Sequence, residues 1–265
     1  MVRVMRASLV QFCAVLLGAL CLLGPSFAHA DPDALWKIVH GQCVPDMTST
    51  DSPAPCLGVD LKAGWAALKD RRGATQVLLI PTDRIAGIES PLLLRKGAPN
   101  YWQYAWGARS YVEKLAARPI PREDLSLAVN SQLGRSQNQL HIHVDCLRPD
   151  VRDALAAGLG GIGPRWSRFP TPLAGHRYIA RRLDGAELDE RNPFKLLAEA
   201  DRQARRDMGH ETLVVAGALF ADGKPGFVLL ADRADPAHAD LGSGEDLQDH
   251  ACQVLAPSPT AASKP

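Results

Sequence analysis

The sequence predicts an α+β protein in which helices flank an antiparallel sheet. Residues 136–147 alternate polar and apolar side chains, the period-two pattern of a strand with one buried face. Residues 77–80 form an apolar run stopped by proline, and residues 212–231 have the composition of a hairpin. Residues 101–117 and 193–208 carry apolar side chains at helical spacing. Short strands joined by turns, with separate helices, are typical of this fold class.

Residues 1–30 have the features of an export signal. Arg3 and Arg6 precede an apolar run from about residue 9 to residue 24, and residues 28–30, Ala-His-Ala, offer a small-x-small cleavage site. The length of the run leaves both a cleaved signal peptide and a retained N-terminal membrane anchor open. Basic residues before the run and acidic residues after it place the rest of the chain on the periplasmic side of a bacterial-type inner membrane.

Residues 31–160 are expected to form the first region of the exported body. Residues 61–69 and 76–80 predict two strands of a meander. Residues 125–130 predict a further strand, which leads through a polar loop into the alternating strand. This region therefore contains most of the expected sheet.

The predicted helix over residues 101–117 begins with an aromatic-rich half. Aromatic stripes at helical spacing most often belong to a hydrophobic core. The functional alternative is that Tyr101, Trp102 and Trp106 line a pocket for acyl chains or for a nucleobase.

Residues 161–256 are expected to form a C-terminal α/β region packed on the first. A strand is predicted at residues 176–182, ahead of the helix and hairpin named above. Residues 226–233 resemble residues 76–84, which indicates either a degenerate second half-repeat or chance similarity between two apolar strands. Residues 257–265 have the composition of a disordered tail.

Four of the six cysteines lie in the exported body, where an even number suggests disulfides. Cys43 and Cys56 flank a loop rich in proline, serine and threonine that a local bridge would stabilise. Cys146 would then pair with Cys252 and tie the C-terminal segment to the core. The chain has no CxxC motif, which argues against a structural zinc cluster or a thioredoxin-like redox site.

The charge pattern narrows the class of partner. The net charge is +1 at pH 7, and no long basic run occurs. The sequence therefore lacks the electrostatic footprint of a nucleic-acid-binding protein, and a small molecule or a lipid is the default substrate.

The polar face of the alternating strand carries the candidate chemistry. Gln139, His141, His143 and Asp145 share this face, and imidazole and carboxylate groups titrate or coordinate near neutral pH. In a nucleophilic site, one imidazole would attack phosphorus and its neighbours would fix its tautomer. In a metal site, the two histidines and the aspartate would act as ligands. Further metal ligands would come from His176, His210, His238 or His250.

Residues 127–145, LAVNSQLGRSQNQLHIHVD, resemble the histidine-triad superfamily. In that superfamily a strand ending in Asn leads through a loop with Gly and Gln into His-x-His-x-His, and the middle histidine is the nucleophile. The family's Gln lies four residues before the first histidine, as Gln137 lies before His141. The resemblance therefore implies a histidine-triad-like fold, with His141 in the first position and His143 as the nucleophile.

Asp145 stands where that superfamily has its third histidine, so the way in which the leaving group is assisted must differ. In this register Asp145 would hold a tautomer or a water molecule. The resemblance also implies that the polar side chains of the preceding loop bind phosphate oxygens. These candidates are Asn130, Arg135, Ser136 and Gln137.

A second block, residues 67–87, is similar to a segment in which the superfamily binds the ribose of its nucleotide. Asp70 falls at the ribose position, and Lys69 is a weaker substrate-binding candidate. The superfamily's histidine on the following strand is absent, and Gln76 lies in that neighbourhood.

Over almost the whole body, the sequence looks like the CDP-diacylglycerol pyrophosphatases. The shared segments are LWKIV, IESPLLL, QNQLHIHVDC, RPDVRDAL, GHRYIARRL and QDHACQVL. The resemblance implies a membrane-associated hydrolase of phosphorus-containing anhydrides. It would split CDP-diacylglycerol into CMP and phosphatidate through a nucleotidyl-histidine intermediate, without a cofactor or metal. Two alternatives remain: an exported metal-dependent phosphohydrolase, and a non-catalytic lipid- or nucleotide-binding module.

Overall fold

The computed structural model describes residues 31–200 and 202–256, so the expected leader and the expected tail lie outside the described residues. The chain divides into two compact units, Met1–Asp31 and Pro32–Pro265, and the elements below all belong to the second unit. Within the described part, no helix combines the length and the apolar character that crossing a bilayer requires.

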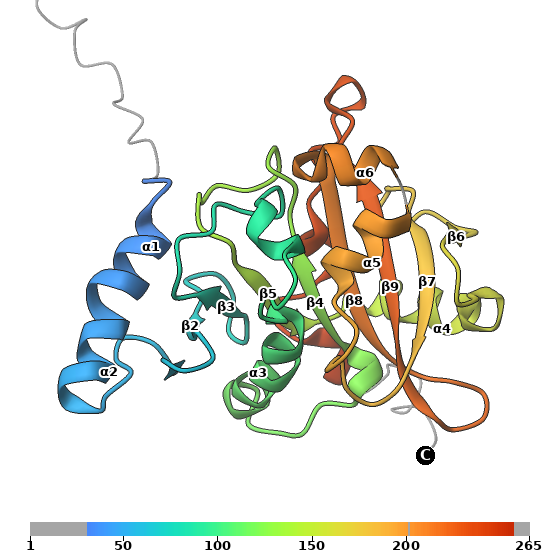
Figure 1. The fold of residues 1–265 in the computed structure, drawn as a ribbon. Helices are drawn as coiled ribbons and strands as arrows, with labels where there is room; N and C mark the ends of the chain where they lie inside the picture. The colour runs from blue at the N-terminus through green and yellow to red at the C-terminus, as the bar shows by residue number, and fades with distance from the viewer. Residues whose placement is uncertain (1–30, 201, 257–265) are drawn as a thin grey trace, which may run out of the picture. The chain divides into compact units, whose positions relative to one another are not determined.

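Nine strands in the described part form one sheet, antiparallel at every pairing, in the order β1-β2-β3-β5-β4-β8-β9-β7-β6. The strands are β1 (Gly58–Asp60), β2 (Trp65–Lys69), β3 (Val77–Pro81), β4 (Leu125–Val129), β5 (Ile142–Cys146), β6 (Ser167–Arg168), β7 (Ile179–Asp184), β8 (Glu211–Leu219) and β9 (Pro225–Arg233). Every residue of β3, β4 and β5 is buried, so the histidine strand lies inside the sheet (Figure 1).

The predicted hairpin is confirmed as β8 and β9, which pair along all nine residues of each strand. Gly223 occupies the turn with φ +74°, a left-handed conformation in which a side chain would be strained. The backbone N–H groups of Gly223 and Phe220 close the turn on the carbonyls of Phe220 and Lys224. The Asp-Gly pair at this point thus specifies the reversal locally.

The helices are α1 (Ala34–Ile38), α2 (Val44–Thr50), α3 (Tyr101–Leu115), α4 (Pro149–Gly158), α5 (Pro193–Ala200) and α6 (Arg202–Arg206), with a π-helical turn at Val39–Cys43. Short 3-10 turns are η2 (Pro91–Leu94), η3 (Arg122–Asp124), η4 (Leu159–Gly161), η5 (Met208–His210), η6 (Pro236–His238), η7 (Gly244–Leu247) and η8 (Gln253–Leu255). The helix expected over residues 193–208 corresponds to α5 and α6, and residue 201 between them lies outside the described residues.

The stretch between Cys43 and Cys56 corrects the sequence expectation of a loop, because its first half is the helix α2. Pro45 lies in the first turn, where a missing N–H costs no hydrogen bond. The hydroxyl groups of Thr48 and Ser49 donate to the carbonyls four residues earlier. A composition rich in proline, serine and threonine is therefore compatible with a short helix when proline comes first.

One face of the sheet packs against α3 and α5, which lie in front of the strands in Figure 1. Trp102 contacts Phe194 of α5, and Trp106 packs edge-on against Phe227 of β9, with ring centroids 5.1 Å and 4.9 Å apart. Tyr101, Trp102 and Trp106 are all buried in this cluster. The core interpretation of the aromatic stripe is therefore confirmed.

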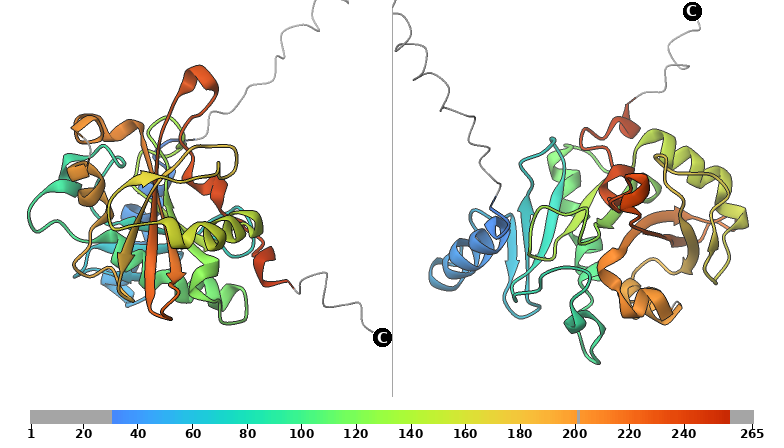
Figure 2. Two further views of the ribbon diagram at one scale, coloured as in Figure 1. Left: turned by 90° about the vertical axis from the view of Figure 1, so that its right-hand side faces the viewer. Right: turned by 90° about the horizontal axis from the view of Figure 1, so that it is seen from above.

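The opposite face carries two separate apolar clusters with a polar gap between them. At one end, α1 and α2 cover Leu78 and Ile80 of β3. At the other, α4 and the segment that follows it cover Ala128 of β4 and side chains of β8 and β9. Figure 2 shows α4 and the C-terminal segment on the side of the sheet away from α5. His143 pairs with Leu78 on one side and Ala128 on the other, so the histidine face fills the gap.

Both predicted disulfides are present. Cys43 is bonded to Cys56, and Cys146 is bonded to Cys252. The second bond joins the end of β5 to the C-terminal segment, across a sequence separation of 106 residues. It therefore fixes that segment next to the histidine strand.

Candidate active site

His143 and Asp145 lie on one face of β5, and His141, directly before the strand, lies on the same face, as the alternation predicts. Their exposed fractions are 9%, 4% and 0%. The two imidazoles, here called the histidine pair, lie with ring centroids 4.8 Å apart and planes inclined at 65°. Burial makes the charged form of each imidazole costly, so the site favours neutral histidines.

The ring of His143 has polar neighbours at Nδ1 and, among the described residues, no hydrogen-bond partner at Nε2. Nδ1 lies 3.0 Å from Nε2 of Gln76 and 3.4 Å from Oε2 of Glu245. Among the described residues, neither Nε2 of His143 nor Oε1 of Gln76 has a hydrogen-bond partner, although both atoms are buried. Turning the Gln76 amide by half a turn would give its oxygen a partner, with Nδ1–H as the donor. In that arrangement Nε2 carries the free lone pair.

The protonation of His143 follows from its surroundings. Burial, and next the neighbouring His141, hold the pKa of His143 well below its usual value. A neutral imidazole with a free lone pair is the form that acts as a nucleophile.

His141 is oriented by the backbone. Its Nδ1 lies 2.7 Å from the carbonyl oxygen of Gln139 and donates to it, which leaves Nε2 as the basic nitrogen. Burial lowers the pKa of His141. The amide of Gln139 donates in turn to the carbonyls of Pro81 and Asp83. Gln139 therefore has a structural part, since it ties the start of the histidine strand to the end of β3.

Asp145 is the centre of a buried hydrogen-bond network. It accepts from the hydroxyl of Thr75 at 2.8 Å, from the backbone N–H of Cys146 at 2.9 Å and from Nδ1 of His250 at 2.8 Å. Burial raises the pKa of Asp145, and the hydrogen bond to Asp145 raises the pKa of His250. His250 therefore keeps its proton to higher pH than an isolated imidazole would.

The C-terminal segment, residues 244–255, lies against the site. Asn130 and Glu245 bond each other in both directions: the amide donates to Oε1 at 3.1 Å, and the backbone N–H of Glu245 donates to the amide oxygen at 3.2 Å. Gln248 donates to the backbone carbonyl of His143 at 3.2 Å. Asn130 thus positions the Glu245 carboxylate next to Nδ1 of His143, and phosphate binding by Asn130 stays a prediction.

Sequence reasoning did not assign His250, Glu245 or Gln248 to the nucleophilic site. His250 appeared as one of four candidate further metal ligands, His250 and Gln248 both lie in the shared segment QDHACQVL, and Glu245 had no signal of its own. The available clue was the predicted disulfide. Cys252 pairs with the residue directly after Asp145, which brings the neighbouring His250 close to that carboxylate.

Two side chains of the predicted phosphate-binding loop bond to other parts of the chain, and Arg135 acts to lower the pKa of His141. Arg135 forms a two-pronged ion pair with Glu89, with Nη2 and Oε1 2.7 Å apart. Gln137 accepts from the backbone N–H of Leu35 in the first turn of α1, at 3.0 Å. Ser136 is exposed. Phosphate binding by these three residues stays a prediction.

Lys69 is the last residue of β2, and Asp70 begins the turn between β2 and β3. Asp70 accepts from the backbone N–H of Arg72, and Lys69 donates to the carbonyls of Asp70 and Gly73 at 2.6 and 3.0 Å. These bonds shape the turn. The carboxylate of Asp70 acts to raise the pKa of both members of the histidine pair, against the larger effect of their burial. Ribose binding by Asp70 stays a prediction.

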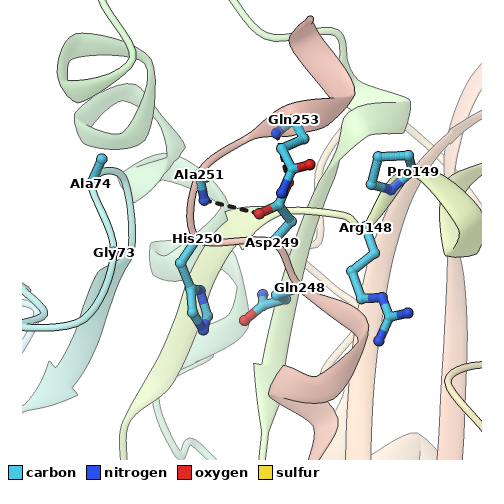
Figure 3. A pocket seen from close by; sticks show the side chains of 9 residues that line it. All are labelled: Gly73, Ala74, Arg148, Pro149, Gln248, Asp249, His250, Ala251 and Gln253. Atoms are coloured by element: carbon cyan, nitrogen blue, oxygen red, sulfur yellow. Dashed lines mark hydrogen bonds between the residues drawn. The ribbon is translucent and has the colours of Figure 1, made fainter.

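Two adjoining hollows open next to His250, with volumes of about 600 Å³ and 370 Å³. Arg148, Gln248 and His250 line both of them, and Arg72 lines the smaller one. Figure 3 shows His250 and Arg148 on either side of Gln248. Arg148 is itself paired with Asp150, and Glu245 and Asp246 also line the smaller hollow, so the lining carries charges of both signs.

Among the described residues, two groups of three potential ligands have their ligand atoms within 4.8 Å of one another. They are Asp145 with Cys146 and Cys252, and His176 with Asp232 and Asp240. The cysteines of the first group are bonded to each other, and the histidine pair belongs to neither group.

A neutral buried imidazole with a carboxylate–histidine pair beside it is the arrangement expected of a phosphohydrolase that uses a histidine nucleophile. The family model described as CDP-diacylglycerol pyrophosphatase matches residues 30–256. The chain is also 45% identical over 250 residues to a CDP-diacylglycerol pyrophosphatase of Yersinia pestis, covering 94% of this chain and 95% of the relative. The chain belongs to the CDP-diacylglycerol pyrophosphatase family.

Proposed function

We propose that this protein hydrolyses the pyrophosphate bond of CDP-diacylglycerol, with CMP and phosphatidate as products, in phospholipid metabolism. Family membership supports the substrate and the bond that is cleaved. The observation that carries the chemistry is His143, whose buried Nε2 has no partner among the described residues while Nδ1 lies beside Gln76 and Glu245. Such an imidazole is prepared to form a bond to phosphorus.

In the proposed mechanism, the Nε2 lone pair of His143 attacks the cytidylyl phosphorus and phosphatidate leaves. Water then cleaves the P–N bond and releases CMP. Glu245 stabilises the Nδ1–H of the modified ring, which carries more positive charge than the free imidazole. His141 lies against the ring of His143 and orients it.

We also propose that the fold is histidine-triad-like. The support is local: β4 ends at Val129, Asn130 and the polar loop follow, and β5 returns antiparallel beside β4. A division into residues 31–160 and 161–256 remains a proposal too, with β4 and β8 paired between the two regions. If the second region is a degenerate half-repeat, the strand order places β9 opposite β5 across the β4–β8 pair.

The site is proposed to work at the periplasmic surface of the inner membrane. A lipid substrate resides in the bilayer, and the charge asymmetry around the apolar run near the N-terminus supports export. The run would hold or deliver the enzyme to that surface.

The test is to incubate the purified chain with CDP-diacylglycerol in detergent micelles and to measure CMP. Rapid acid-free quenching with labelled substrate should trap a CMP adduct on His143. Label on His141, or unchanged turnover in His143→Ala, would overturn the assignment of the nucleophile. Loss of activity with a chelator would instead favour a metal-dependent hydrolase, and binding without turnover a non-catalytic module.

A further inference from the structure

We propose that His250, held by Asp145, is the catalytic acid and base on the leaving-group side of this reaction. The inference rests on the proposed function and adds a residue to it. His250 reaches the site from a segment more than a hundred residues away in sequence: its separation from Asp145 is 105. In this way the chain places a third imidazole in the site, although its third triad position is an aspartate.

The His250–Asp145 pair differs from the surface histidine–aspartate pairs of this protein. Asp145 is 0% exposed and the side chain of His250 is 26% exposed, so a fully buried carboxylate holds an imidazole that solvent and substrate can reach. By contrast, the pair of His238 and Asp235 is local in sequence, and its side chains are 82% and 53% exposed. A buried carboxylate on Nδ1 fixes the tautomer and directs Nε2 outward.

The backbone around His250 is anchored at several points. The carbonyl of His250 accepts from the backbone N–H of Ala74 at 2.9 Å and from the hydroxyl of Thr75 at 3.2 Å. The N–H of Asp249 donates to the carbonyl of Cys146, and Cys252 is bonded to the same residue. Fixed supports of this kind are needed to hold an acid–base group at a productive distance.

The position of His250 matches the leaving side of the attack on phosphorus. Asp145 is two residues from His143 on the same strand face, so His250 lies over the same face as the nucleophile. His250 also lines both hollows, together with Arg148, and Arg72 lines the smaller one. An imidazolium at this hollow can donate a hydrogen bond to the phosphate of the departing phosphatidate, and Arg72, Glu245 and Asp246 line the same hollow.

The first half-reaction transfers the cytidylyl group from the substrate to His143. Nε2 of His143 forms the P–N bond, the bridging P–O bond breaks, and its electron pair remains on the phosphatidate oxygen. His250 gives its Nε2 proton to that oxygen and becomes neutral.

In the second half, neutral His250 takes a proton from the attacking water as the P–O bond of CMP forms. The P–N bond breaks and its electron pair returns to His143. Both residues are then back in their starting states.

The test is His250→Asn with two substrates that share the cytidylyl group. The amide N–H of asparagine can still donate to Asp145, while the acid–base function is lost. His238→Asn is the matched control, because it removes the histidine of an exposed histidine–aspartate pair. The substrates are CDP-diacylglycerol and the p-nitrophenyl ester of CMP, whose leaving group departs without a proton.

Turnover of CDP-diacylglycerol by His250→Asn should fall by roughly 10²- to 10⁴-fold, the usual contribution of a general acid or base. With the p-nitrophenyl ester, the variant should release about one equivalent of p-nitrophenolate per active site rapidly and then turn over slowly. The slow phase reports the missing base, and labelled CMP should accumulate on the protein. His238→Asn should match the wild type with both substrates.

Wild-type turnover in His250→Asn would overturn the proposal. So would the loss of both the burst and the turnover, provided that the variant unfolds at the wild-type urea midpoint. His250→Gln is the second variant if asparagine weakens the fold, and the same outcomes apply. Absence of CMP release by the wild type would overturn the proposed function itself, which separates the two failures.

Discussion

Removal of the Cys146–Cys252 disulfide is expected to destabilise the protein more than removal of Cys43–Cys56. The two bonds close loops with sequence separations of 106 and 13 residues. In the chain-entropy account, loops of these lengths stabilise the fold by about 4.7 and about 3 kcal/mol, respectively. The expected difference between the two double variants is therefore about 1.7 kcal/mol.

The two disulfides form a matched comparison. In each pair one cysteine is 0% exposed and the other is 6% exposed, so replacement of both by alanine creates similar packing defects. The packing cost should cancel between the Cys43→Ala/Cys56→Ala and Cys146→Ala/Cys252→Ala variants. The remaining difference then reports the loop lengths.

The assay is equilibrium unfolding in urea followed by circular dichroism, with the slope of the transition checked in each variant. Activity supplies a second measurement, because Cys252 lies two residues from His250 and its loss should lower kcat as well as stability. Equal losses of unfolding free energy, or a larger loss for Cys43→Ala/Cys56→Ala, would refute the loop-length argument. Wild-type kcat in Cys146→Ala/Cys252→Ala would show that the bond does not position the site.

Three further predictions concern the site. His143→Ala should abolish turnover, whereas His141→Ala, which loses only orientation, should slow kcat by roughly 10²-fold; equal losses in steady-state assays would contradict these roles. Activity should fall at acidic pH as His143, with its lowered pKa, gains a proton, and at alkaline pH as His250, with its raised pKa, loses one. A pH–rate profile of His250→Asn should then lack the alkaline limb, although Asp145 and Glu245 remain. Glu245→Gln keeps the contact to Asn130 but removes the charge near Nδ1, and kcat should fall by up to roughly 10²-fold; an unchanged kcat would exclude an electrostatic role.

Local patterns were sufficient for much of the fold and for the centre of the site. Strict alternation in the histidine strand predicts which side chains share a face, because the period of a strand is two. The Asp-Gly turn predicts the hairpin from backbone conformation alone. Four body cysteines, two of them around a short segment, were enough to pair the disulfides correctly. The expected loop at that segment was wrong in its first half, since composition describes a preference and not the hydrogen bonds of a helix.

The rest depended on contacts between residues far apart in sequence. Asp145 and His250 meet because β5, the turn before β3 and the C-terminal segment are bonded together, and no periodicity relates positions 105 residues apart. The same holds for the loop side chains expected to bind phosphate. Arg135 pairs with Glu89 and Gln137 with the start of α1, because burial requires each polar group to find a partner wherever the fold supplies one. The sequence by itself determined that the two histidines share one strand face, and it predicted which of them is the nucleophile. Only the tertiary structure decided which charged and polar groups surround them, because those groups come from segments far away in the sequence.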